Sequence, residues 1–165
     1  MFRKSPQGRL TTGLVLTAVA VLWLVPAAAA RGEGGIIGRW LTANHHAVVE
    51  IGHCGADICG RLDWLYRPIR HGAPARDENN PDQSRRGRPL CGLVMLYDFK
   101  PDPSNPRHWR GGYIYDPETG DTYHAEMTLV DPAHLHLRGY VGIPLFGETQ
   151  TWTRIKANYP ICHLP

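Results

Sequence analysis

Residues 109–155 most strongly constrain the fold, because they read as four β-strands in immediate succession. Short alternating runs rich in Thr, Tyr, Val and Trp are separated by turn residues such as Pro117-Glu118-Thr119-Gly120 and Asp131-Pro132-Ala133. Alternation of this kind, interrupted by turns at short intervals, is typical of an antiparallel β-meander. The segment therefore predicts an all-β architecture, and it indicates no particular reaction.

Four further strands are predicted upstream, over residues 36–42, 46–53, 58–66 and 92–98. A long connection over residues 67–90 and a Pro-rich loop over residues 100–108 separate the later strands. Eight antiparallel strands in sequence order close most economically on themselves, since closure removes exposed sheet edges. We therefore predict a single up-and-down barrel, which can fill with side chains or hold one small ligand. A two-sheet sandwich is the alternative, and pairing of the first strand with the last distinguishes the two.

The hairpin around residues 131–133 permits a prediction of strand register. If these three residues form the loop, Val130 opposes His134, and Glu126 opposes Arg138 on the solvent side. A two-residue loop would mix apolar and polar faces, so period-two burial favours the three-residue loop. The predicted core includes the tryptophans of three strands, which are Trp40, Trp64 and Trp152. In the third strand Trp64 shares the apolar face, and Asp63 lies on the opposite face.

The first thirty residues are predicted to be a secretory signal peptide. Basic residues precede an apolar run over residues 10–25, and four alanines ending at Ala30 follow it, which favours cleavage after Ala30. A membrane anchor is the alternative, but the apolar run is short for a bilayer span. We expect residues 31–165 to form one exported domain, bacterial periplasmic or secreted, with no stable membrane anchor.

Removal of the predicted signal peptide would change the net charge of the chain. The sequence has 18 Lys and Arg residues against 15 Asp and Glu residues, and the surplus equals Arg3, Lys4 and Arg9 of the predicted signal. The remaining domain has no formal net charge with His neutral. Because phosphate neutralisation needs a clustered positive surplus, we expect no nucleic-acid partner.

Four cysteines follow the predicted cleavage site, which suits an oxidising compartment. Cys54 and Cys59 bracket a short segment and could face each other across a tight β-turn. Cys91 and Cys162 would then form the second bridge. Three pairings are possible in principle, and four reduced thiols are the alternative.

Several motifs recur in an order that resembles a known family. They are Gly38-x-Trp40, Cys59-Gly60-Arg61, Asp77-x-x-Asn80-Pro81-Asp82, Arg86-x-Arg88-Pro89-Leu90, Ile114-Tyr115-Asp116-Pro117 and Thr151-Trp152-Thr153-Arg154. Over about residues 36–155 they resemble the exported bacterial family called domain of unknown function 2147. The resemblance implies a small secreted or periplasmic lipocalin-like β-barrel with no established activity. Cys91 stands where the family pattern has an aliphatic residue, and this departure supports the Cys91–Cys162 bridge.

The loop of residues 67–90 is the predicted ligand-binding site, because connections this long are often binding loops. It has six arginines against three acidic residues, and arginine binds carboxylates and phosphates through paired hydrogen bonds. We expect an acidic or amphipathic small molecule or an envelope glycan as the ligand. The alternative is a structural loop, in which acidic and amide side chains cap turns and pair with the arginines. The predicted ligand-binding residues are Asp77, Asn80, Asp82, Arg86 and Arg88.

Other chemistry has weaker support. His124, His134 and His136 share one predicted strand face and could ligate a metal with Glu126, but the register places that face in solvent. We therefore expect no metal and no cofactor. Residues 31–165 contain only two serines and no Gly-x-Ser-x-Gly motif, so no catalytic residue is predicted. An envelope enzyme acting on a glycan or lipid, and a structural partner of another envelope protein, stay as alternative functions.

Overall fold

The computed structural model of the chain describes residues 35–156, 159, 160 and 162. Residues 31–165 make up one compact unit, and every strand lies within it. The predicted signal peptide falls outside the described residues and stays a prediction. No helix in the described part of the chain is long and apolar enough to cross a membrane.

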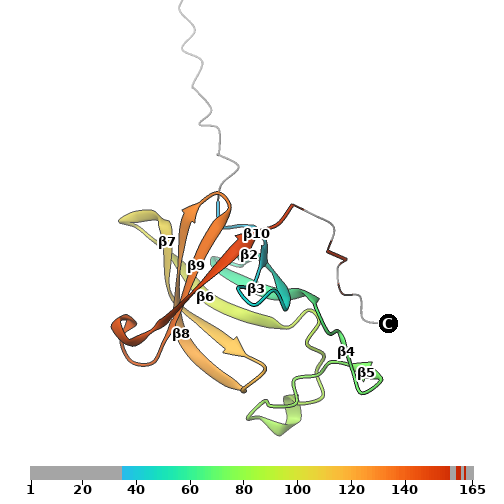
Figure 1. The fold of residues 1–165 in the computed structure, drawn as a ribbon. Helices are drawn as coiled ribbons and strands as arrows, with labels where there is room; N and C mark the ends of the chain where they lie inside the picture. Colours follow the sequence, from blue (N-terminus) through green and yellow to red (C-terminus); the bar gives the residue numbers. More distant parts are fainter. Residues whose placement is uncertain (1–34, 157–158, 161, 163–165) are drawn as a thin grey trace, which may run out of the picture. The chain divides into compact units, whose positions relative to one another are not determined.

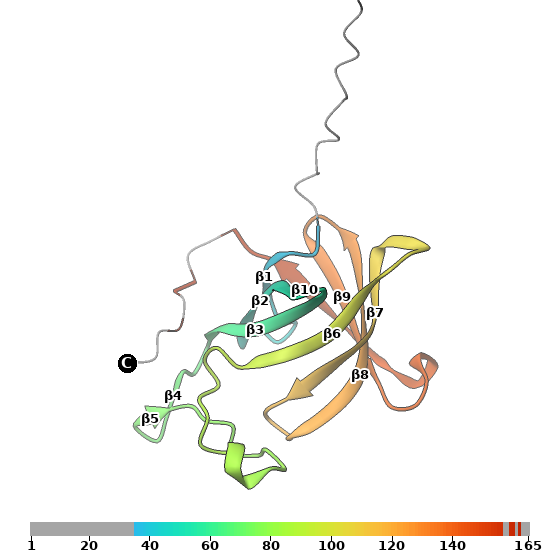
Figure 2. The same cartoon turned by 180° about the vertical axis from the view of Figure 1, so that it is seen from behind.

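Eight antiparallel strands form a closed barrel (Figures 1 and 2). Each strand pairs with its neighbour along the chain, and the first strand pairs with the last through Trp40↔Arg154 and Leu41↔Thr153. This closure confirms the predicted up-and-down barrel and excludes the sandwich. The barrel strands are β1 (Gly38–Leu41), β2 (Ala47–Cys54), β3 (Asp57–Leu65), β6 (Val94–Asp102), β7 (Asn105–Asp116), β8 (Asp121–Asp131), β9 (His134–Tyr140) and β10 (Glu148–Arg154).

Connections between the strands lie alternately at the two ends of the barrel. The turns β2–β3, β6–β7 and β8–β9 lie at one end, which we call the closed end. The connections β1–β2, β3–β6, β7–β8 and β9–β10 lie at the other end, which we call the mouth. The β3–β6 connection is the long loop; it carries the short strands β4 (Ile69–Arg70) and β5 (Ala73–Pro74) and the 3-10 turn η1 (Gln83–Arg85). In Figure 1 this loop extends below the barrel.

Arg154 seals the closed end. Its guanidinium donates hydrogen bonds to the carbonyl oxygens of Ile37 at 2.8 Å and Pro132 at 2.6 Å, and it lies 4.1 Å from the ring centroid of Trp40. A Cβ on Gly38 would approach Nη1 of Arg154 to 2.7 Å, and the φ of Gly38 is +137°. Glycine at this position therefore allows the arginine to cover the tryptophan.

The core confirms two of the three predicted tryptophans. Trp40 and Trp152 are buried among the inward-facing residues of the barrel, but Trp64 is only half-buried. The β2–β3 register shifts between Val48↔Trp64 and Val49↔Leu62, so Asp63 is an extra residue in β3. Beyond this bulge, the residues of β3 face the sides opposite to those that simple alternation predicts. The core prediction for Trp64 is therefore wrong: its ring packs edge-on against Tyr159, with centroids 4.8 Å apart.

Asp63, whose strand face could be either the lumen or solvent on the sequence alone, is buried in the structure. It forms an ion pair with Arg39 at 2.5 Å. Its carbonyl oxygen also accepts a hydrogen bond from the backbone N–H of Cys162 at 2.8 Å. The described part of the C-terminal segment therefore contacts the bulge in β3.

The predicted Pro-rich loop over residues 100–108 is also wrong, because β6 and β7 continue through it as a ribbon. Pro101 pairs with Trp109, beyond the last β3–β6 pair, Ile58↔Phe99. A proline lacks the N–H that a central strand needs, but beyond the barrel wall β6 has a partner on one side only. Pro101 in β6 and Pro106 in β7 are therefore compatible with strand structure here.

The β8–β9 hairpin has the predicted register over six consecutive pairs, including Glu126↔Arg138 and Leu129↔Leu135. The turn itself differs, since Asp131 and not Val130 opposes His134. Both predicted disulfides, Cys54–Cys59 and Cys91–Cys162, are present, each with a Cα–Cα distance of 5.8 Å. The second bridge joins the end of the long loop to the C-terminal segment.

Candidate functional site

The barrel contains a cavity of about 550 Å³ that opens at the mouth. Volumes of this size are usual for sites that hold one small molecule. The wall is built from residues of seven barrel strands together with Leu90 of the long loop. Its apolar members are Ala47, Leu62, Leu65, Leu90, Met95, Ile114, Leu137 and Trp152.

Small residues decide which part of the barrel stays open. Around the middle of the barrel, Phe99 lies so close to Gly112 that any Cβ there would clash with its ring, and Leu96 packs likewise against Gly60. Towards the mouth, Gly139 faces the cavity, and a Cβ on it would make only ordinary contacts, the nearest at 3.7 Å to Ile114. The cavity is therefore the part of the interior that large side chains do not fill.

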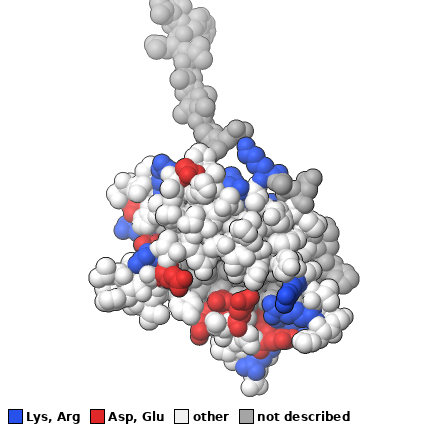
Figure 3. All heavy atoms as spheres, in the orientation of Figure 1, with Lys and Arg blue, Asp and Glu red and all other residues white. Residues whose placement is uncertain are grey.

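Charged side chains of both signs surround the opening. Arg67 and Arg70 line it from the long loop, and Asp116, Glu118 and Glu148 line it from β7, the β7–β8 turn and β10. Among the described residues, none of these five takes part in an ion pair within 4.0 Å. Figure 3 shows acidic and basic side chains gathered at the lower end, which is the mouth end in Figure 1. The rim can therefore bind charged groups of a ligand.

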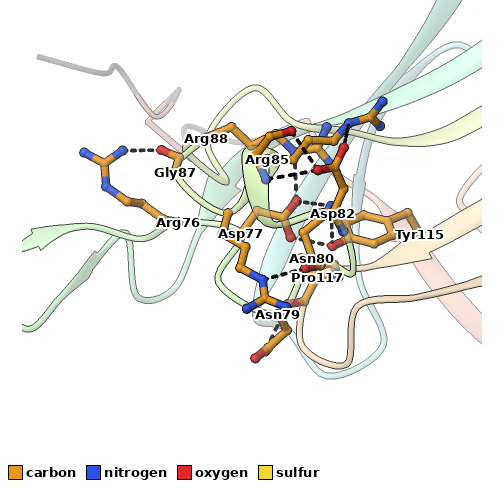
Figure 4. A network of polar contacts seen from close by, with 12 residues as sticks. Arg76, Asp77, Asn79, Asn80, Asp82, Arg85, Gly87, Arg88, Tyr115 and Pro117 are labelled. Atoms are coloured by element: carbon orange, nitrogen blue, oxygen red, sulfur yellow. Dashed lines mark hydrogen bonds and ion pairs between the residues drawn. The ribbon is translucent and has the colours of Figure 1, made fainter.

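The predicted site residues form a polar network beside this opening (Figure 4). Asp77 is fully buried, and its Oδ2 accepts hydrogen bonds from Arg88 Nε and Asn80 Nδ2, both at 2.8 Å. The hydroxyl of Tyr115 in β7 donates to the other oxygen of Asp77 at 2.5 Å. The network therefore ties the long loop to the barrel wall.

The two other predicted residues act within the loop. Arg86 Nε donates to the backbone oxygen of Asn80 at 2.7 Å. Asp82 caps η1, since its Oδ1 accepts from the backbone N–H of Ser84 at 3.0 Å, and it pairs with Arg85 at 3.1 Å. None of the five predicted residues lines the cavity. Direct ligand contact by them stays a prediction.

The loop is also fixed to the β7–β8 turn. Asn79 Nδ2 donates to the backbone oxygen of Glu118 at 2.7 Å. Gly120, with a φ of +84°, leaves no room for a side chain, because a Cβ there would overlap the carbonyl oxygen of Asn79. Anchored at both places, the loop carries Arg67, Arg70 and Leu90 to the cavity. These three residues, and the strand residues opposite, are lining residues that sequence reasoning missed.

Burial and hydrogen bonds shift the pKa values of two side chains in this loop network, Tyr115 and Asp82. Burial raises the pKa of Tyr115 above its usual value, and the hydrogen bond to Asp77 and the charge of that residue raise it further. Tyr115 therefore stays a hydrogen-bond donor at neutral pH. The pKa of Asp82 is lowered, mainly by its two hydrogen bonds from Ser84. Protonated Tyr115 and ionised Asp82 are the forms that make the hydrogen bonds observed in the loop.

The histidines that could suggest a metal site are engaged elsewhere. His134 Nδ1 lies 2.8 Å from Asp131, and His124 stacks between the rings of Tyr113 and Tyr140. The described part of the chain holds no group of three or more His, Cys, Asp or Glu side chains that could ligate a metal ion. The apolar side chains of the cavity wall can contact an apolar group, and the charged rim can contact a polar one.

Comparisons with known proteins agree with the fold. Residues 38–154 match the model of a family described as an uncharacterized protein conserved in bacteria (DUF2147). A similar solved structure is protein HP1028 from the human pathogen Helicobacter pylori, described as belonging to the lipocalin family. It is 21% identical, covers 74% of this chain and 84% of its own, and has a TM-score of 0.66. A search of curated proteins finds no match. The match over most of the barrel shows that this chain belongs to the DUF2147 family.

Proposed function

We propose that the barrel binds one small amphipathic molecule, with its apolar part inside the cavity and its polar head at the mouth. The observation that carries this proposal is the cavity of about 550 Å³, which is lined by eight apolar side chains, by several polar uncharged ones and, at the mouth, by charged ones. Eight-stranded barrels of this size can hold a single small ligand. A glycan could pair its hydroxyl groups with polar lining residues such as Thr42, Asn44 and Gln150, but it would leave the leucines of the wall without an apolar partner.

The rim supports an anionic head group. Arg67 and Arg70 lie at the opening and make no ion pair with a carboxylate among the described residues. Arginine binds carboxylates and phosphates with paired hydrogen bonds. Asp116, Glu118 and Glu148, which also line the cavity, can accept hydrogen bonds from hydroxyl or amine groups of the same head. The ligand is therefore an amphiphile whose head has an acidic group and hydrogen-bond donors.

The same proposal places the protein in the bacterial envelope or outside the cell. Two disulfides support this placement, because such bridges persist in oxidising compartments. The sequence pattern of residues 1–30 supports it independently. An amphiphile of the envelope is then the available ligand class.

Filling the cavity tests the binding mode. We expect residues 31–165 to bind cis-parinaric acid, a fluorescent fatty acid, and Gly139→Leu to weaken that binding at least about tenfold, because the leucine occupies the ligand's space. Gly52→Leu is the matched control, since a Cβ on Gly52 has open space around it. Equal binding by both variants, with both folded by circular dichroism, would contradict the proposal.

Recognition of the head is tested at the rim. In the double variant Arg67→Gln and Arg70→Gln, we expect parinaric acid to bind about tenfold more weakly, because an ionic hydrogen-bond pair is lost. The alcohol made by reducing the acid should bind both proteins alike. Arg61→Gln with Arg110→Gln, two arginines that do not line the cavity, is the control. Equal losses of affinity for the acid and the alcohol would show that the two arginines do not recognise the carboxylate.

A further inference from the structure

The loop between β9 and β10, residues 141–147, is the most apolar exposed segment in the described part of the chain. Its sequence is Val-Gly-Ile-Pro-Leu-Phe-Gly, with no charged or hydrogen-bonding side chain. Val141 is 73% exposed, Ile143 52%, Leu145 76% and Phe146 78%. Exposed apolar residues gathered in one place mark surfaces that contact a partner or a membrane.

The loop is held in a defined shape by Arg138 of β9. Arg138 Nε donates to the carbonyl oxygen of Pro144 at 2.7 Å, and Nη2 donates to that of Leu145 at 3.2 Å. Nη1 donates to the hydroxyl of Thr149 in β10 at 2.7 Å. The guanidinium therefore lies under the 3-10 turn η2 (Pro144–Phe146) and fixes it to both strands.

Further hydrogen bonds pair the backbone of this turn internally. The N–H of Phe146 donates to the oxygen of Ile143 at 3.3 Å, and the N–H of Gly147 donates to that of Pro144 at 3.0 Å. Pro144 has no N–H to satisfy. Three successive carbonyl oxygens, those of residues 143–145, thus have partners within the protein.

The internal hydrogen bonds of this loop indicate which kind of partner its surface can contact. A protein surface can supply donors and acceptors to a loop, but the apolar part of a bilayer cannot, so inserted backbone must be satisfied internally. Charged side chains also oppose insertion, and this loop has none. An apolar tip in which the carbonyls of residues 143–145 are already bonded is therefore better suited to lipid than to a hydrogen-bonding protein groove.

The loop lies at the rim of the cavity. It joins the end of β9 to the start of β10, and Gly139 near the end of β9 and Glu148 at the start of β10 both line the cavity. Figure 1 shows it projecting outward from the barrel at the side of β8 and β9. A surface that contacts this loop would therefore lie close to the cavity opening.

We propose that residues 141–147 insert into the interfacial region of a phospholipid bilayer and bring the barrel mouth to the membrane surface. Leu145 and Phe146 are the inserting side chains, and Arg138 is the positioning residue that presents them. The inference adds a membrane contact to the proposed function, and it does not require the cavity to be filled. A ligand could then pass between bilayer and cavity over a short distance.

Flotation with large unilamellar vesicles tests the contact. Residues 31–165, which hold the whole barrel, are mixed with vesicles of phosphatidylcholine, with or without phosphatidylglycerol. We expect the double variant Leu145→Ser and Phe146→Ser to lower the bound fraction at least about tenfold, because two large side chains lose their burial. Ile37→Ser with Val130→Ser, apolar residues exposed away from the loop, is the matched control and should change binding less than twofold.

Two readouts separate insertion from other causes of binding. On vesicles of phosphatidylcholine alone, raising the salt should leave wild-type binding unchanged, because the inserting loop is uncharged. In a Phe146→Trp variant, brominated lipids should quench additional fluorescence relative to the wild type, which locates residue 146 in the bilayer. Binding that disappears in salt, or the absence of additional quenching, would overturn the proposal.

The remaining outcomes are also decisive. If the wild type floats with neither vesicle, or if both double variants bind equally, the loop is no membrane contact. If the loop variant instead abolishes an oligomer seen by sedimentation velocity, the surface is an interface between copies of the chain. Parinaric acid in buffer should bind the loop variant as it binds the wild type, so failure of docking and failure of cavity binding are distinguishable.

Discussion

Asp77 is fully buried, and its two oxygens together accept hydrogen bonds from Tyr115, Asn80 and Arg88. A buried carboxylate is stable only when such partners replace the water it has lost. Here the partners come from the long loop and from a barrel strand. A single residue therefore fixes the position of a loop that carries three cavity-lining side chains.

We expect Asp77→Asn to lower the free energy of unfolding by about 2–3 kcal/mol, because it leaves Arg88 without its counter-charge. The value is below that for a fully buried pair, since the side chain of Arg88 is 36% exposed and water replaces part of the interaction. Asp82→Asn is the control, because its carboxylate is 49% exposed; it should cost less than about 1 kcal/mol. Urea unfolding measures both, and equal losses would contradict the role given to Asp77.

Tyr115 gives the network a pH dependence on the alkaline side. Its folded pKa is raised above 10.0, the usual value, mainly by burial. Between the unfolded and folded pKa values the folded chain binds the additional proton, so stability falls as the pH rises from about 10. Tyr115→Phe should lose this contribution and show a shallower decline in melting temperature above that pH. An identical decline of the melting temperature in the wild type and in Tyr115→Phe would contradict this role of Tyr115.

At the scale of elements, strand pairing could be predicted where alternation is regular. The Glu126↔Arg138 register of β8 and β9 follows from placing Met127 and Leu137 on one face, and the structure has it. The bulge at Asp63 could not be predicted, because an inserted residue leaves no local sequence signal and only the partner strand reveals it. Trp64 was therefore assigned to the wrong face.

The candidate site was predictable only in part. The arginine-rich loop was identified from its length and composition, and it does reach the mouth. Which of its residues line the cavity depends on the anchoring of Asp77 and Asn79 to β7 and its turn, and these contacts span residues far apart in sequence. The cavity itself depends on Gly139 and on side-chain volumes from several strands. No short sequence window contains that information.

The two disulfides should differ in their contribution to stability. Cys91–Cys162 spans a sequence separation of 71 residues and Cys54–Cys59 a separation of 5. On the chain-entropy account, replacing the first pair by alanine costs about 4 kcal/mol and replacing the second about 2 kcal/mol. Loss of the first should also shift Trp64 emission to the red, because Tyr159 no longer covers it. Guanidinium unfolding with the opposite order of losses would contradict this assignment.

At the scale of the whole molecule, the two ends of the barrel have different roles. Arg154 and Trp40 seal one end. At the other end the cavity opens, lined there by residues of the β1–β2 connection, the long loop and the β7–β8 turn. The cavity, the charged rim and the apolar loop thus all belong to the mouth. This arrangement suits a carrier that takes up an amphiphile at a surface and shields its apolar part from water.

Native mass spectrometry of the protein purified from its own cells tests the central claim, that the cavity holds a small amphipathic molecule. The account predicts a wild-type protein that carries an additional small-molecule mass, a Gly139→Leu variant that lacks it, and a Gly52→Leu variant that retains it. The bound molecule, once released, should have an acidic head and an apolar body. Wild-type protein of bare polypeptide mass, or an adduct that persists in Gly139→Leu, would contradict the account.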